Sequence, residues 1–242
     1  MNEATKTRAL LTAAERSLLR GKGIDIGCGA DPITQTCRRF DVDDGDANHV
    51  TAYVKEPGSF DYVASIHSLE HMNSPEESLQ DWWTLLKPGG ILLLVVPDED
   101  LYEQGYWPSV FNPDHKSTFT ISKQTSWSPV SRNLLDLAKA LPGAEVLSLR
   151  LQDQSYDRGL LFAGLWPNRW AGLSSYLRSR MPPRATLRIR LLQVLYVALR
   201  LPVDQTFGEA TAQILVLLRK ALPRAGTGPA AYVLPKESVD ER

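Results

Sequence analysis

Residues 23–32 read GIDIGCGADP, a short apolar segment that runs into a glycine-rich turn. The apolar residues predict a buried strand. Gly27 and Gly29 carry no Cβ atom, so the backbone of the turn can approach a ligand closely. Asp25 immediately precedes this turn and Cys28 lies within it. We therefore predict a ligand-binding turn at the carboxyl end of a strand, with these four residues as candidate contacts.

Alternating strand and helix patterns surround this turn. The segment ILLLVVP at 91–97 is apolar throughout, as expected for a central strand that is covered on both faces. The alternation predicts an α/β protein with a Rossmann-like, mostly parallel seven-stranded sheet and helices on both faces. Strands are expected at 23–27, 37–43, 60–66, 91–97, 145–151 and 212–220, and helices at 3–20, 75–87 and 131–141.

The length of 242 residues and the hydrophobic fraction of 43% fit one large domain. We expect this domain to span residues 1–222, with a helical insertion at about 154–210 before the last strand. Residues 98–130 form a loop-rich stretch with many aromatic residues. Residues 223–242 are poor in core residues and are expected to be a mobile tail.

A second segment, FDVDDGDAN at 40–48, places acidic residues after the second predicted strand. A carboxylate there can accept hydrogen bonds from both hydroxyls of a ribose, and Asp41 and Asp43 are the candidates. Asp46 and Ala47 follow at the position where nucleoside-binding sites of this kind contact an adenine ring. A solvated acidic loop is the alternative interpretation for each of these aspartates.

A third segment, FDYVASIHSLEHMNSPEESLQDWWTLLKPGGILLLVVPD at 60–98, combines an FD strand, an LEH segment, a helix ending in LKPGG and an apolar strand. Together with GIDIGCG it resembles the class I S-adenosylmethionine-dependent methyltransferase superfamily, in particular its type 11 branch. The resemblance covers residues 20–100 and resumes weakly in the last two strands.

This resemblance implies S-adenosylmethionine as the cofactor. Gly27 and Gly29 would contact its methionine part, and Asp25 would support that turn. Asp46 and Ala47 would face the adenine. Ile66 and His67, at the end of the strand 60–66, would line the sulfonium end.

The chain departs from the superfamily pattern at three points. The third glycine of its first motif is replaced by Asp31, and the spacings from Gly29 to Asp41 and from Asp41 to Asp46 are short. The first crossover helix must therefore be trimmed or absent, and a second helix is expected to be missing. A nicotinamide dehydrogenase is disfavoured, because it needs the third glycine and a full helix under the pyrophosphate.

Methyl transfer to a hydroxyl requires a group that takes up the hydroxyl proton. His67 and His71 lie in HSLEH, and His115 lies in FNPDHKSTFT at 111–120. We predict His115 as the general base, with His67 and His71 as further catalytic candidates. An exposed loop position for His115 and a structural role for His71 are the alternatives.

The segment FNPDHKSTFT, together with DQTFGEATAQILVLLRK at 204–220, resembles methyltransferases encoded among bacterial surface-polysaccharide enzymes. That likeness implies an O-methyltransferase acting on a sugar hydroxyl of a glycan or glycolipid, with aromatic residues stacking on the sugar. Another small metabolite or lipid acceptor, and a binding module without catalysis, are the alternatives. The aromatic residues are equally compatible with core positions.

Charge and composition limit the partners. The formal net charge of −1 argues against nucleic-acid binding, and the two cysteines form neither a disulfide framework nor a metal motif, so no metal is expected. No signal peptide or apolar run of spanning length is present, which predicts a cytoplasmic protein.

Residues 166–200 contain seven arginines and no acid. They predict contact with the inner face of a membrane, an acidic acceptor or a second copy in a homodimer, or else a helix covering the sheet edge.

Overall fold

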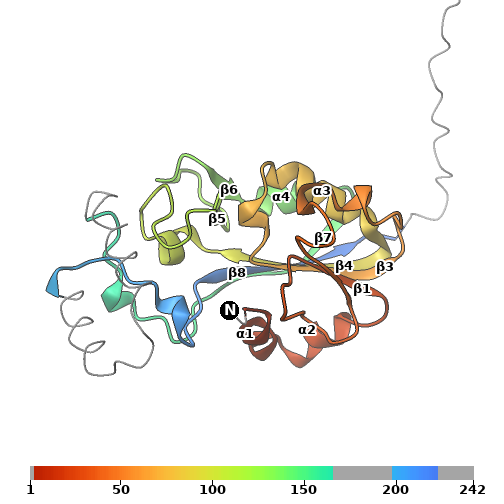
Figure 1. The fold of residues 1–242 in the computed structure, drawn as a ribbon, viewed down its shortest axis with the longest axis horizontal. Helices are drawn as coiled ribbons and strands as arrows, with labels where there is room; N and C mark the ends of the chain where they lie inside the picture. The colour runs from red at the N-terminus through yellow and green to blue at the C-terminus, as the bar shows by residue number, and fades with distance from the viewer. Residues whose placement is uncertain (1–2, 166–197, 223–242) are drawn as a thin grey trace, which may run out of the picture.

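The computed structural model describes residues 3–165 and 198–222. A central sheet lies between two layers of helices (Figure 1). Helices α1 (Glu3–Leu10) and α2 (Ala13–Leu18) cover one face, and α3 (Pro75–Leu85) and α4 (Leu134–Ala140) cover the other. The predicted α/β class, with helices on both faces of the sheet, is confirmed.

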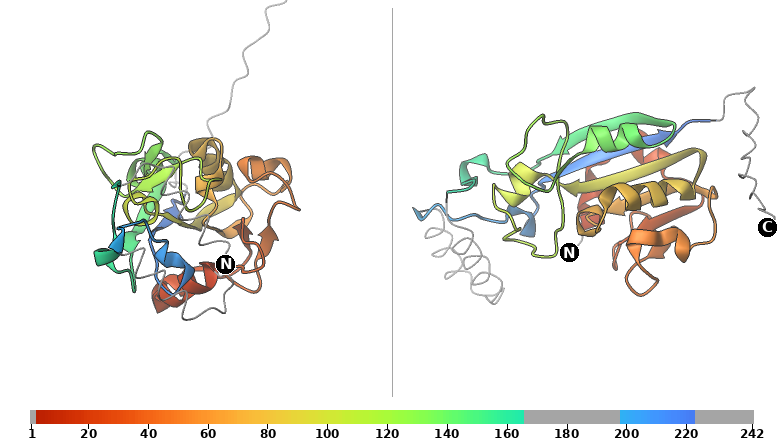
Figure 2. Two further views of the ribbon diagram at one scale, coloured as in Figure 1. Left: turned by 60° about the vertical axis from the view of Figure 1, so that its left-hand side comes forward. Right: turned by 90° about the horizontal axis from the view of Figure 1, so that it is seen from above.

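The main sheet has the strand order β2-β1-β3-β4-β8-β7. Strands β1 to β4 pair in parallel, whereas β8 runs antiparallel to both of its neighbours, β4 and β7. Figure 2 shows β8 between these two strands from a second direction. The strands are β1 (Gly23–Ile26), β2 (Arg38–Phe40), β3 (Phe60–Ile66), β4 (Leu86–Pro97), β7 (Ala144–Gln152) and β8 (Gln213–Lys220).

The prediction of seven strands was wrong, because the described main sheet has six. The chain between β2 and β3 spans only residues 41–59 and contains turns and the 3-10 helix η1 (Ala47–Ala52). A further parallel edge strand would need a crossover of a dozen or more residues on each side. The short connection therefore leaves β2 at the edge. Strands β5 (Thr118–Thr120) and β6 (Ser131–Asn133) form a separate two-stranded sheet.

The first predicted helix is broken in two by a local cap. The Oγ1 atom of Thr12 accepts a hydrogen bond from the backbone N of Glu15 (3.1 Å), and the Glu15 carboxylate accepts one from the backbone N of Thr12 (2.8 Å). This reciprocal pair starts a new helix at α2. The helix predicted at 131–141 likewise begins later, at Leu134, where Asn133 caps α4 after β6.

Strand β4 confirms the reading of residues 91–97 as a strand covered on both faces. Leu92, Leu94 and Val96 pack in the cluster with α3 and α4, and the alternate residues pack in the cluster with α1 and α2. Successive side chains of a strand point to opposite faces, so an apolar run is what two covered faces require.

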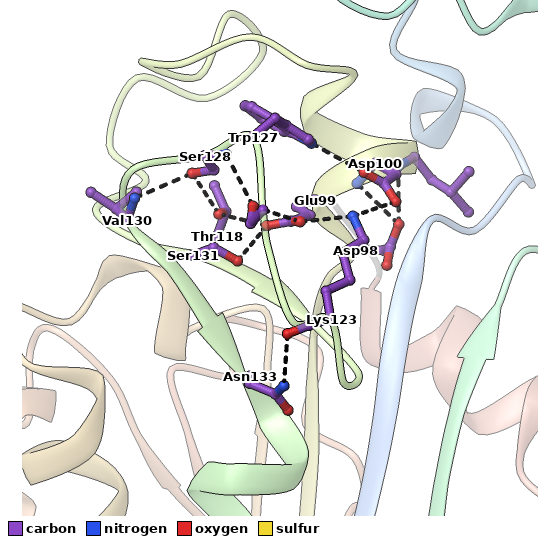
Figure 3. A network of polar contacts seen from close by, with 12 residues as sticks. Asp98, Glu99, Asp100, Thr118, Lys123, Trp127, Ser128, Val130, Ser131 and Asn133 are labelled. Atoms are coloured by element: carbon purple, nitrogen blue, oxygen red, sulfur yellow. Dashed lines mark hydrogen bonds and ion pairs between the residues drawn. The ribbon is translucent and has the colours of Figure 1, made fainter.

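The loop-rich stretch after β4 is anchored by one buried carboxylate, that of Glu99 in the short helix η3 (Glu99–Glu103) (Figure 3). Its oxygens accept hydrogen bonds from Lys123 (2.8 Å), Ser126 (2.8 Å), Thr118 (3.2 Å) and Ser131 (2.5 Å). Because these donors come from both strands of the small β5–β6 sheet and from the loop between them, Glu99 fixes this stretch beside the end of β4.

The predicted helical insertion is only partly described. Its described ends contain the short 3-10 helices η4 (Arg158–Leu160) and η5 (Gln205–Phe207). The arginine-rich residues 166–197 and the predicted tail at 223–242 lie outside the described residues. Within residues 3–165 and 198–222, no helix has the length and apolar character needed to cross a bilayer.

Candidate active site

The carboxyl ends of β1, β3 and β4 meet at one edge of the sheet, where parallel α/β sheets bind their ligands. A cavity of about 500 Å³ lies beside the ends of β1 and β3, and we call it the cofactor cavity. It brings together six of the predicted site residues. It is lined by Glu3, Ala4, Asp25, Gly27, Cys28, Gly29, Ala30, Asp31, Ile66 and His67.

The turn after β1 depends on glycine. Gly27 has a φ of +74° and Gly29 a φ of +54°, both in the left-handed region. A Cβ atom on Gly27 would stand 2.0 Å from the Oγ atom of Ser68. That hydroxyl donates a hydrogen bond to the carbonyl oxygen of Ile26 (3.1 Å) and so ties the turn to the segment after β3.

Asp25 closes the same turn from inside the protein. Its Oδ2 atom accepts a hydrogen bond from the backbone N of Ile33 (2.6 Å), whereas its Oδ1 atom has no hydrogen-bond partner in the described part of the chain. Burial raises the pKa of this carboxyl to about 7. The role of Asp25 in supporting a cofactor-binding turn stays a prediction.

Asp31, which replaces the third glycine of the motif, holds helix α1 in place. Its carboxylate accepts hydrogen bonds from the backbone N (2.7 Å) and Oγ1 (2.8 Å) of Thr5 and pairs with Arg8 (3.0 Å). The start of α1 thereby reaches the cofactor cavity through Glu3 and Ala4. Sequence analysis missed these two residues, because no motif marks the first helix as part of the site.

The acidic segment after β2 is only partly next to the cofactor cavity. The Oδ2 atom of Asp41 lies 3.7 Å from the place a Cβ atom on Gly29 would take, whereas Asp43 is exposed. Asp46 caps η1 by accepting a hydrogen bond from the backbone N of Asn48 (2.9 Å), and the hydrogen bonds from Asn48 lower the pKa of Asp46.

Ala47 accepts a hydrogen bond at its carbonyl oxygen from the indole of Trp82 in α3 (2.8 Å). None of the four residues predicted here, Asp41, Asp43, Asp46 and Ala47, is among the residues that line the cofactor cavity.

A second cavity of about 190 Å³ adjoins the first, and we call it the acceptor cavity. It shares Glu3 and His67 with the cofactor cavity. All three histidines predicted to be catalytic line it, although they come from two separate segments of the chain. Its remaining lining is mixed in polarity: Glu70, Pro97, Tyr102, Asn112, Thr206, Ala210, Thr211, Ala212 and Gln213.

His67 is held between two buried partners. Its Nε2 atom lies 2.8 Å from Oε1 of Gln213, and its Nδ1 atom lies 3.5 Å from Oε1 of Glu70. Burial alone would lower the pKa of His67, but the carboxylate of Glu70 outweighs it and raises this pKa above its ordinary value. The backbone of His67 has a φ of +56°, which is unusual for a residue other than glycine.

His115 is a buried residue of the acceptor cavity, so the alternative of an exposed loop histidine is excluded. Its Nδ1 atom lies 2.6 Å from Oε1 of Glu103, which is itself buried. The backbone N atoms of Lys116 and Ser117 donate to the carbonyl oxygen of Glu70 at 2.7 and 3.2 Å. These hydrogen bonds bring the loop that carries His115 against the segment after β3.

His71 lies beside His115, with 5.0 Å between the ring centroids. Its Nδ1 atom lies 2.9 Å from Oδ2 of Asp114. Sequence analysis missed Glu70 and Glu103, although Glu70 stands inside the quoted HSLEH segment. The pattern carries no signal that either carboxylate is buried beside a histidine.

The aromatic residues of the 98–130 stretch divide between the core and the site. Tyr106 and Phe119 are almost fully buried. Tyr102 lines the acceptor cavity, with its ring centroid 5.3 Å from that of His115. Trp127 is 39% exposed, and its indole donates a hydrogen bond to Asp100 (3.1 Å). Of these four, Tyr102 is the one that lines either cavity.

Solved structures share this fold at low sequence identity. A protein of Bacillus halodurans assigned as a candidate methyltransferase is 16% identical, with a TM-score of 0.50, over 86% of this chain and 96% of that one. A phosphoethanolamine N-methyltransferase of Haemonchus contortus in complex with S-adenosyl-L-methionine is 13% identical, with a TM-score of 0.45, over 85% and 51% of the two chains. No curated protein matches the chain significantly.

A family profile described as a methyltransferase domain matches residues 2–127, more than half of the chain. The matched range includes the glycine turn, the strands β1 to β4 and all three histidines of the acceptor cavity. The chain therefore belongs to the methyltransferase domain family and is a class I methyltransferase with S-adenosylmethionine as its cofactor.

Proposed function

We propose that the protein is an O-methyltransferase that methylates a sugar hydroxyl of a glycan or glycolipid. One observation carries this proposal: a cavity lined by three histidines, an asparagine and a tyrosine adjoins the cofactor cavity and shares His67 with it. Such a lining offers hydrogen bonds to a hydroxylated acceptor and an imidazole to take its proton.

In this proposal the turn after β1 binds the cofactor. Its methionine part would lie against Gly27, Cys28 and Gly29, whose backbone leaves room for it, with Asp25 beneath. The sulfonium end would lie by Ile66 and His67, and His67 lines both cavities.

At the other end of the cofactor, Asp41 accepts hydrogen bonds from the ribose, since it lies beside Gly29 while Asp43 is exposed. Asp46 and Ala47 contact the adenine.

Methyl transfer follows as an in-line displacement. Bound S-adenosylmethionine would supply the methyl group: the oxygen of the acceptor hydroxyl would form a C–O bond to it while the C–S bond of the sulfonium breaks. The hydroxyl proton passes to Nε2 of His115. Glu103, 2.6 Å from the Nδ1 atom, orients the ring and stabilises the imidazolium that forms.

The arginine-rich residues 166–200 give the proposal a second part. A lipid-linked glycan would bring the enzyme to an anionic membrane surface, which a stretch with seven arginines and no acid would favour. Co-sedimentation with vesicles containing anionic lipid, compared with neutral vesicles, checks this part; no binding to the anionic vesicles would remove it.

Transfer of labelled methyl groups from S-adenosylmethionine to a panel of saccharides tests the main proposal. We expect label in a base-stable ether on a hydroxylated acceptor, and a loss of about 10²–10⁴-fold in kcat for His115→Gln with unchanged affinity for the cofactor. The exposed His49 offers the control variant His49→Gln. Label only on amine acceptors, or full activity of His115→Gln, would contradict the assignment.

A further inference from the structure

Glu70 is a buried carboxylate without the hydrogen bonds that such a group needs. It is 1% exposed, and neither Oε1 nor Oε2 has a hydrogen-bond partner within the described ranges. The nearest basic atom, Nδ1 of His67, is 3.5 Å from Oε1 and lacks hydrogen-bond geometry. A buried carboxylate is costly unless it is paired or binds a cation, so Glu70 calls for a further partner.

The imidazoles of His71 and His115 lie next to Glu70, and a carboxylate contacts the Nδ1 atom of each ring. Nδ1 of His115 lies 2.6 Å from Glu103, and Nδ1 of His71 lies 2.9 Å from Asp114. A carboxylate at Nδ1 fixes the proton on that atom and leaves the lone pair on Nε2. This arrangement is the usual one for metal-binding histidines, whose second nitrogen donates to a carboxylate.

The three residues converge on one point. Glu70, His71 and His115 each offer a ligand atom, and these atoms all lie within 4.8 Å of one another. Ligands of a tetrahedral zinc ion are about 3.4 Å apart at the bond lengths of about 2.0–2.1 Å that zinc prefers. Cation binding would therefore draw the most widely separated of these atoms together by up to about 1.4 Å.

We propose that Glu70, His71 and His115 bind a divalent first-row transition-metal cation. Two imidazoles and one carboxylate suit such a cation better than they suit magnesium or calcium, which prefer oxygen ligands alone. The three residues also line the acceptor cavity, so the open coordination positions face the space where the acceptor oxygen would lie. His67 does not belong to this cluster of converging ligand atoms.

The catalytic role of the cation rests on the proposed function, whereas the binding site itself does not. A hydroxyl oxygen bound to the cation has a lowered pKa, loses its proton to water and attacks the methyl carbon, while the C–S bond breaks. In this state His115 is a ligand. In the cation-free protein it takes the proton itself, at a slower rate.

Cobalt(II) titration of the tag-free, chelator-treated chain tests the site without any acceptor. Visible absorption reports the cobalt environment, and calorimetry with zinc chloride gives the stoichiometry. We expect one cation per chain and at least ~10-fold weaker binding for Glu70→Gln and for the partly exposed His71→Ala. The variant His49→Ala, in an exposed histidine outside the cluster, should bind as the parent does.

Cation binding that is absent in the parent, or unchanged in both Glu70→Gln and His71→Ala, overturns the proposal. Thermal unfolding and cofactor binding check that each variant is folded. If Glu70→Gln does not fold, His71→Ala still tests the site. Label transfer by the chelator-treated protein separates the two proposals. Cation binding without transfer to any hydroxyl contradicts the proposed function alone, whereas transfer without cation binding contradicts the metal site alone.

Discussion

At the scale of single residues, Gly27 meets two demands at once: a φ of +74° and a Cβ position only 2.0 Å from Oγ of Ser68. We expect Gly27→Ala to lower the free energy of unfolding by about 2 kcal/mol or more, through backbone strain and the clash, and to weaken cofactor binding. Denaturant unfolding and calorimetry with S-adenosylmethionine measure these effects.

Gly58 provides the matched control for this substitution. Its φ of +65° is similar, but no atom lies within 4 Å of the place its Cβ would take. Gly58→Ala should therefore show the strain without the clash and leave the cofactor affinity unchanged. Equal cofactor affinities for Gly27→Ala and the parent would rule out a tight approach of the ligand to this turn.

The buried carboxyl of Asp25 should make stability depend on pH. Burial raises its pKa from 3.8 to about 7 in the folded protein. Between these values the folded chain keeps a proton that the unfolded chain has lost, so its contribution to the free energy of unfolding falls as pH rises, by up to ~1.4 kcal/mol per pH unit.

Asp25→Asn removes this contribution. Urea unfolding at pH 5 and pH 8 should show the variant gaining on the parent as pH rises. Asp98, whose pKa burial raises to about 6, titrates alike in both proteins and cancels in the comparison. A stability difference between variant and parent that is the same at both pH values would exclude a buried, protonated Asp25.

At the scale of elements, Glu99 joins η3 to both strands of the small β5–β6 sheet and to the loop between them through four side-chain hydrogen bonds (Figure 3). We expect Glu99→Ala to destabilise the protein by about 2 kcal/mol and to raise amide exchange at 118–133 more than elsewhere, because several donors lose their acceptor. Hydrogen-exchange mass spectrometry locates the change, with the exposed Glu77→Ala in α3 as the control.

His115 lies in the loop between η3 and β5, the two elements that Glu99 joins. Glu99→Ala should therefore also lower kcat, although Glu99 lines neither cavity. Exchange that rises evenly over the whole chain, or only at the termini, would mean that the loop is held by other contacts.

At the scale of the whole molecule, the start of the chain completes a cavity that is otherwise built from β1 and β3. Helix α1 is held there by Asp31, which accepts two hydrogen bonds from Thr5 and pairs with Arg8. We expect Asp31→Ala to reduce the thermal stabilisation that S-adenosylmethionine gives, because ligand binding then has to order α1 first. Differential scanning fluorimetry with and without cofactor measures the shift.

Asp136→Ala, in an exposed residue of α4, is the control for the loss of an aspartate. It should leave the cofactor-induced shift unchanged. A full shift in Asp31→Ala would show that α1 takes no part in holding the cofactor.

Some errors of sequence interpretation could have been avoided, and others could not. The motif Thr12-x-x-Glu15 is a local cap that could have divided the first helix, and the length of residues 41–59 could have ruled out a seventh strand. Burial of Glu70 and Glu103 has no such local sign, because it arises when the loop that carries His115 folds over the end of β4.

The sequence by itself determined the glycine turn, the covered strand at 91–97 and the helices on both sides. These features follow from local rules of backbone freedom and side-chain alternation. Only the tertiary structure decided the chemistry of the acceptor cavity. His67 meets Gln213 from 146 positions away, because β8 runs antiparallel and begins beside the carboxyl end of β4. The loop that carries His115 reaches Glu70 because the backbone N atoms of Lys116 and Ser117 donate to its carbonyl oxygen.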